Sequence, residues 1–231
     1  MTIGIIAISI FFMLIGMLVQ FQLKSKFTEY SKILTSSGLS GSEIAQKMLL
    51  DNGIYDVQVI STPGFLSDHY DPAKKTINLS EDVYYAKTVS AAAIAAHECG
   101  HAVQHANAYS MLQLRSKLVP VTQISTRLSQ WVILAGLGIL GFGGGSQTVL
   151  LIGILLFAVS TLFTIITLPV EFDASARALQ WLNAANITRP GEYEKAKDAL
   201  KWAALTYVVA ALASIAMLAY YIMLYNGRQR N

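Results

Sequence analysis

The sequence has a single cysteine, Cys99, and only 13% of its residues are charged. One cysteine excludes a disulfide within the chain and fits a reducing compartment. There is no glycine-rich phosphate loop and no basic stripe with interleaved aromatic residues, so we expect no nucleic-acid partner. The formal net charge of +3 is small. What dominates instead is hydrophobicity, since 54% of the residues are hydrophobic.

Charged residues are absent from three long stretches, residues 2–23, 128–170 and 202–227. About 20 apolar residues are enough for a helix to cross a bilayer. The first and last stretches each predict one span, and the middle one is long enough for two, joined by a turn at residues 143–147. The four predicted spans lie at about 3–23, 127–143, 148–170 and 203–225. A re-entrant hairpin is the alternative for the second span, because its apolar part is short.

The N-terminal stretch lacks the basic leader and the small-residue cleavage site of a signal peptide, so we expect a retained anchor. No Lys or Arg precedes it, and Lys24 and Lys26 follow directly. With four spans, all of the 17 basic residues except Arg228 and Arg230 lie on one side. The positive-inside rule makes that side the cytoplasm. We therefore predict a multi-pass protein of the cell membrane with its hydrophilic part in the cytoplasm.

The hydrophilic part predicts a small α+β domain. Residues 40–43 are typical of a capped helix start, and Asp51-Asn52-Gly53 is typical of its end. Three β-like runs follow at 57–60, 65–70 and 75–79. The fold class is thus a mostly α membrane protein with about four transmembrane helices and a small α+β domain with a short sheet. The predicted segments are the anchor 1–23, the domain 24–127, the hairpin 128–170, a helical segment 171–202, and the last span with its tail, 203–231.

The segment 171–202 is expected to hold two helices, separated by a break at residues 188–191. The second, at 192–202, has its charges on one face and is expected to lie along the membrane surface.

The most specific motif is His97-Glu98-Cys99-Gly100-His101. It is expected to lie on a helix that begins with an alanine-rich run and has Ser90 as its N-cap. Histidines four apart lie on one face of a helix, where both can hold one Zn²⁺ while Glu98 acts as a general base. Gly100 would let another backbone approach this helix closely, and neutral drift is the alternative explanation for a glycine there. Cys99 points away, and we interpret it as a small buried residue, with a reactive thiol as the alternative.

Catalytic zinc usually has three protein ligands, so one is missing from this motif. His105 is too far along the same helix from His97, about 12 Å, to share one ion with it. Glu171 is the better candidate, because the hairpin 128–170 would return the chain to the membrane face of His97. The alternative is a boundary glutamate in water.

Several polar residues are candidates for supporting roles. His69 and Tyr70 lie in the β-like region, and Asp173 and Arg177 are spaced to pair on one helix. The candidate donors to a transition-state oxyanion are His69, Tyr70, Tyr84, Tyr109 and Arg177. The sequence does not choose among them.

Four segments together resemble the bacterial YugP-like neutral zinc membrane peptidases. They are residues 66–72, 77–80, 95–102 and 169–175, and the resemblance covers nearly the whole chain. It implies a zincin-like domain of the gluzincin type, with Zn²⁺ on His97, His101 and Glu171. HtpX-like and CAAX-prenyl-protease-like enzymes are more distantly similar and have the motif E-x-x-x-D. Here Ser175 stands at the position of that aspartate, and Ser175 or Asp173 is the expected substitute.

The sequence therefore predicts a zinc metalloendopeptidase that cleaves protein or peptide substrates near the bilayer, as in membrane protein quality control. One alternative is a non-enzymatic membrane scaffold with a structural or vestigial metal. A second is an intramembrane protease, which would need its ligands inside a span.

Overall fold

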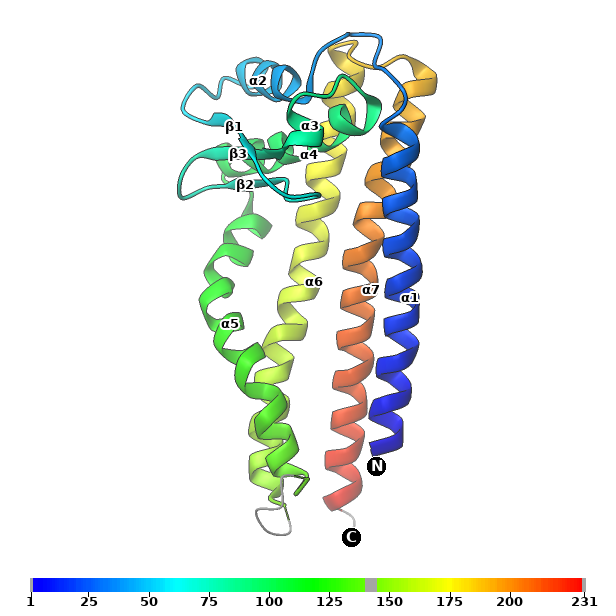
Figure 1. Cartoon of the computed structure of the whole chain (residues 1–231). Helices are drawn as coiled ribbons and strands as arrows, with labels where there is room; N and C mark the ends of the chain where they lie inside the picture. Colours follow the sequence, from blue (N-terminus) through cyan, green and yellow to red (C-terminus); the bar gives the residue numbers. More distant parts are fainter. Residues whose placement is uncertain (1, 140–144, 230–231) are drawn as a thin grey trace. The chain divides into compact units, whose positions relative to one another are not determined.

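The computed structural model describes residues 2–139 and 145–229. The chain is mostly helical, with one small sheet (Figure 1). The helices are α1 (Thr2–Tyr30), α2 (Gly41–Asp51), α3 (Glu81–Tyr84), α4 (Val89–Ala106), α5 (Ser110–Gly136), α6 (Gln147–Ala184) and α7 (Pro190–Gln229). The strands are β1 (Gln58–Thr62), β2 (His69–Asp71) and β3 (Thr76–Ser80). Two compact units are formed, the first from residues 1–18, 114–168 and 206–231, and the second from 19–113 and 169–205.

Three helices in the described part of the chain, α1, α6 and α7, are long and apolar enough to cross a membrane. They contain the predicted spans at 3–23, 148–170 and 203–225. Of the second predicted span, residues 127–136 lie in α5, which is not among the three, and residues 140–143 lie outside the described residues. Four spans therefore remain a prediction.

The helices α6 and α7 each continue beyond the charge-free stretches. The predicted helix after residue 171 is confirmed, but it is the last part of α6 and follows Pro169 without a break. The separate surface helix predicted at 192–202 is wrong, because these residues form the first turns of the 40-residue α7. The predicted break before it is confirmed, since α7 begins at Pro190, where the missing N–H costs no helical hydrogen bond.

In the first unit, α5 and α6 pack closely through glycines. A Cβ on Gly136 would lie 2.4 Å from the Leu150 nitrogen, and one on Gly153 would lie 2.7 Å from the Ile133 side chain. Arg228 donates to the carbonyls of Gly136 and Leu137, at 2.9 Å each, at the end of α5. The side chain of Arg228 thus caps the C-terminal end of α5. Arg228 is one of the two basic residues outside the predicted cytoplasmic segments.

In the second unit, the sheet has the order β1-β3-β2, with β1 parallel and β2 antiparallel to β3 (Figure 1). All residues of the central strand β3 are buried, and β2 is an edge strand. Three strands are confirmed, although β2 covers only the end of its predicted run.

The helices of this unit cover a core that includes Ile44, Met48, Ile77 and the alanines of α4. The predicted capped start of α2 is confirmed, and Ser40 and Glu43 form a capping box there. The expected N-cap of α4 is wrong, because Thr88 caps the helix and Ser90 is buried inside its first turn.

Candidate metal site

The helix α4 carries both histidines of the motif on one face. The rings of His97 and His101 lie edge to face with their centroids 4.8 Å apart. Their side chains are 14% and 12% exposed. All alanines of α4 except Ala106 are buried, whereas the two rings are partly exposed. The four-residue spacing of the two histidines in the sequence thus places both rings together.

The helix α6 brings Glu171 to these rings. Its Oε2 lies 3.4 Å from Nε2 of His97 and 3.6 Å from Nε2 of His101. The side chain is only 3% exposed. One ligand atom from each residue lies within 4.8 Å of the other two, so the three together could hold one metal ion. Residues about 70 positions apart in the sequence therefore meet at one point.

Gly100 allows α4 and α6 to approach closely enough for this contact. A Cβ placed on Gly100 would lie 2.5 Å from the carbonyl oxygen of Ala174, one turn after Glu171. Real Cβ atoms do not approach backbone so closely, so any larger residue would push the two helices apart. The expectation that Gly100 admits another backbone is confirmed.

Gln104 orients His101. This fully buried side chain donates from Nε2 to the carbonyl of Val170, at 2.7 Å, and to Asp173, at 2.8 Å. Two acceptors fix the amide orientation, so its Oε1 is the atom 3.1 Å from Nδ1 of His101. The His101 proton then sits on Nδ1, which leaves the lone pair on Nε2 toward Glu171.

Ser175 occupies the equivalent place beside His97. Its Oγ lies 3.1 Å from Nδ1 of His97. With the proton on Nδ1, His97 donates to this hydroxyl, and its Nε2 lone pair also points toward Glu171. Asp173 reaches the other histidine indirectly through Gln104, and it also accepts from Nε of Arg177 at 2.6 Å, the predicted i, i+4 pair.

Sequence reasoning missed Gln104. The signal available was its position three residues after His101, on the same side of the helix. Its partners lie on another helix, and nothing in the sequence around residue 104 identifies them.

The electrostatics of the site favour a cation. Burial alone would lower the pKa of the His101 imidazolium, but the hydrogen bond and charge of Glu171, with the charge of Glu98, raise it overall. The site thus presents negative charge to whatever binds at the two Nε2 atoms.

Glu98 and His105 lie on the same helix but outside this cluster. Glu98 is buried, with 8% of its surface exposed. His105 is exposed, and its Nδ1 is 2.9 Å from the hydroxyl of Tyr70. Its exclusion as a ligand agrees with the cluster found among the described residues.

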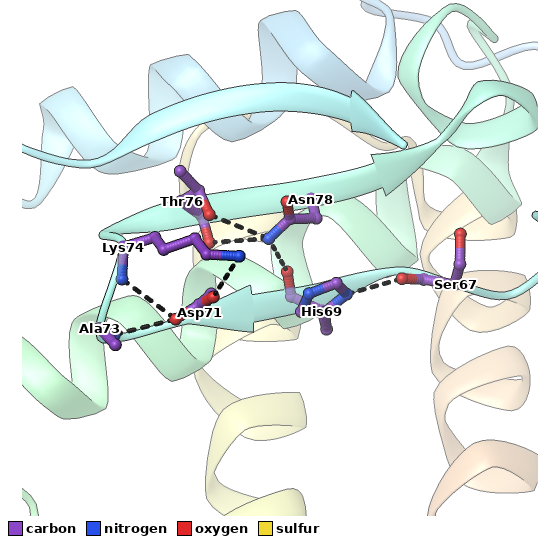
Figure 2. A network of polar contacts seen from close by, with 7 residues as sticks. All are labelled: Ser67, His69, Asp71, Ala73, Lys74, Thr76 and Asn78. Carbon is purple, nitrogen blue, oxygen red and sulfur yellow. Dashed lines mark hydrogen bonds and ion pairs between the residues drawn. The ribbon is translucent and has the colours of Figure 1, made fainter. Parts of the chain in front are cut away.

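The remaining candidates lie on surrounding elements. His69, on the edge strand, has its Nδ1 2.8 Å from the carbonyl of Ser67. Figure 2 shows the two residues in contact. Its backbone carbonyl accepts from Asn78 of β3, which ties the edge strand to the sheet (Figure 2). Tyr84 packs against Tyr85, and the Arg177 guanidinium lies 5.9 Å from the ring centroid of Tyr109.

Cys99 is fully buried, with its thiol directed to the carbonyl of Ala45 at 3.4 Å. Burial raises the pKa of this thiol well above its ordinary value. The interpretation as a small buried residue is confirmed.

Two imidazole nitrogens and one carboxylate are a donor set that catalytic zinc uses, with the other ring nitrogens held by hydrogen bonds. The residues present therefore fit zinc. Together with the long apolar helices, the site defines a membrane-associated protein with a centre of the zinc peptidase type.

The chain belongs to the family described as "putative neutral zinc metallopeptidase", whose model matches residues 5–226. It is 43% identical over 213 residues to the "Putative membrane protease YugP" of Bacillus subtilis (strain 168), and the match covers 92% of each chain. No solved structure matches the chain significantly. Zinc is the metal that this family implies, and a peptidase implies a protein or peptide substrate.

Proposed function

We propose that this protein is a membrane-anchored zinc metalloendopeptidase whose metal ligands are His97, His101 and Glu171. The convergence of these three side chains from α4 and α6 carries the proposal. Zinc bound there would lower the pKa of a water molecule and polarise a substrate carbonyl. Glu98, next to a ligand, accepts the proton of the attacking water and later donates it to the leaving amine.

The residues behind the ligands hold them in position. The Oε1 of Gln104 keeps the proton of His101 on Nδ1, and the Ser175 hydroxyl can accept from Nδ1 of His97, so that each Nε2 faces the metal position. Asp173, held by Arg177, anchors Gln104 in turn. Such supporting hydrogen bonds typically change metal affinity or activity by about 10–100-fold.

Tyr70 is the donor that we assign to the oxyanion. Its hydroxyl is within hydrogen-bond distance, 2.9 Å, of Nδ1 of His105, and His105 lies one turn beyond His101 on α4. When Nδ1 of His105 donates to the Tyr70 oxygen, the phenol proton is available to the substrate. His69 is less suitable, because its Nδ1 donates to the Ser67 carbonyl.

The order of the site residues and the apolar segments along the chain supports four membrane spans. His101 and Glu171 belong to one site, so the chain between them must cross the membrane an even number of times. If α6 supplies one crossing, the segment between residue 128 and the start of α6, which includes the end of α5, must supply the other. We propose that 1–23, 128–170 and 203–231 form the membrane part. In that proposal, 24–127 and 171–202 form a zincin-like cytoplasmic part, in agreement with the positive-inside rule.

Because Glu171 directly follows a charge-free stretch, the proposed site lies near the membrane surface. This favours substrates close to the bilayer, such as misfolded membrane proteins in quality control. The edge strand β2 offers a backbone to which an extended peptide can pair.

Two other functions are less well supported. A scaffold with a structural metal has no need of a base, yet Glu98 is present beside the ligands. An intramembrane protease would need its histidines within a span, and α4 is not among the candidate spans of the described chain.

The test of function is cleavage of casein by the purified, zinc-loaded protein. We expect hydrolysis that stops when a chelator removes the metal and returns when zinc is added back. Analysis of the products should show internal cleavage sites, as an endopeptidase requires. A purified protein that contains no zinc and leaves casein intact would favour the scaffold.

A further inference from the structure

A cavity of about 260 Å³ lies between α6 and α7 in the second unit. Most of its wall is apolar and includes Phe172, Leu179, Leu200 and Leu205. Its polar lining consists of Ser175 from α6 and of Lys197 and Lys201 from α7. The cavity therefore combines an apolar wall with a cationic rim, and this combination suits an amphiphilic anion.

The charge at this rim is positive. Lys197 and Lys201 are spaced by one helical turn and project from the same face of α7. Within residues 2–139 and 145–229, the ion-pair partner of Lys197 is Glu194, at 3.9 Å and largely in water. Asp198, between the two lysines, is bonded to the hydroxyl of Tyr30 at 2.7 Å. No acidic residue is among the described residues that line the cavity.

The cavity lies where both helices change from polar to apolar sequence. Lys201 immediately precedes the charge-free stretch 202–227, and Phe172 follows the stretch that ends at Val170. Phe172, which lines the cavity, is 49% exposed. A lipid at the membrane surface would present its phosphate to the lysines and its upper acyl chain to Phe172 and Leu205.

We propose that this cavity binds one anionic phospholipid and that the bound lipid supports the metal site. The link is Ser175, which lines the cavity and contacts Nδ1 of His97. Nε2 of His97 faces Glu171, so a lipid behind Ser175 does not compete for the metal position. The proposal deepens the proposed function and rests on it, because the expected effect is on peptidase activity.

The test compares two double variants in two kinds of vesicle. Wild type, Lys197→Gln/Lys201→Gln and the control Lys24→Gln/Lys32→Gln are reconstituted in phosphatidylcholine, with or without about one third phosphatidylglycerol. The control removes two lysines that line a different surface, on and just after α1. Phosphatidylglycerol retained by the protein is counted by native mass spectrometry, and casein cleavage is measured in parallel.

We expect wild type and the control to retain one phosphatidylglycerol and to be more active in its presence. In the Lys197/Lys201 variant, lipid affinity should fall about 30-fold, from about 1 kcal/mol for each lysine, and the activation should be lost. Inorganic phosphate added to phosphatidylcholine vesicles should not replace the lipid.

Equal lipid retention by both double variants would overturn the proposal, as would activation that does not depend on Lys197 and Lys201. Specific retention without any peptidase activity would contradict the proposed function but leave the lipid site in place. The two failures are therefore distinguishable.

Discussion

Replacing Glu98 with glutamine is expected to lower kcat/KM for casein by about 10²–10⁴-fold while the protein keeps its zinc. Glutamine has nearly the same shape but cannot accept the proton of the attacking water. The three proposed ligands are untouched, so metal content and folding should be those of wild type. The measurement is casein hydrolysis together with zinc content determined by elemental analysis.

Two comparisons make this result specific. Glu81→Gln removes an exposed carboxylate at the start of α3 and should leave hydrolysis unchanged. Tyr70→Phe should lower kcat less severely and leave KM unchanged, as the loss of one oxyanion donor does. If Glu98→Gln cleaves casein as fast as wild type, Glu98 is not the base.

Replacing Gly100 with alanine is expected to damage both stability and the metal site. Alanine would gain about 1 kcal/mol of helix propensity. The new Cβ, however, would lie 2.5 Å from a backbone oxygen of α6, which cannot turn away as a side chain can. Overpacking of this kind costs about 1–3 kcal/mol, and moving α6 also moves Glu171. We expect a lower melting temperature and a zinc affinity reduced about tenfold or more.

The matched control is Gly191→Ala in the first turn of α7, where a Cβ would meet no atom within 4 Å. This substitution should leave zinc affinity unchanged. A Gly100→Ala protein that melts and binds zinc like wild type would mean that the close contact with Ala174 does not position Glu171.

Half of the candidate site could be predicted from local sequence, because both histidines and Glu98 lie on one helix with fixed periodicity. Glu171 was accessible only through the hairpin topology and the family resemblance, since its contact with His97 spans about 70 residues. Gln104 could not be predicted, because its role depends on Val170 and Asp173 of another helix.

The elements were predicted better than their ends. The alternation of apolar and polar residues, together with the turn residues, predicted the three strands. The capped helix start at residues 40–43 predicted α2. Ser90 and Thr88 are both good N-caps, and the Thr88 side chain accepts from the Ala91 nitrogen in the structure. Residues 192–202 have the charges of a surface helix, but no glycine or proline separates them from the following apolar stretch, so the helix continues.

The most direct test of the account is the zinc affinity of wild type and Glu171→Gln, measured by chelator competition on the purified proteins. In the proposed site, the two histidines of α4 supply two of the three metal-binding residues and Glu171 completes them. Wild type should therefore bind one zinc ion tightly, and Glu171→Gln should bind it about 100-fold or more weakly, with Glu194→Gln as an unaffected control. Equal affinities of wild type and Glu171→Gln, or a wild type that binds no zinc, would contradict the account.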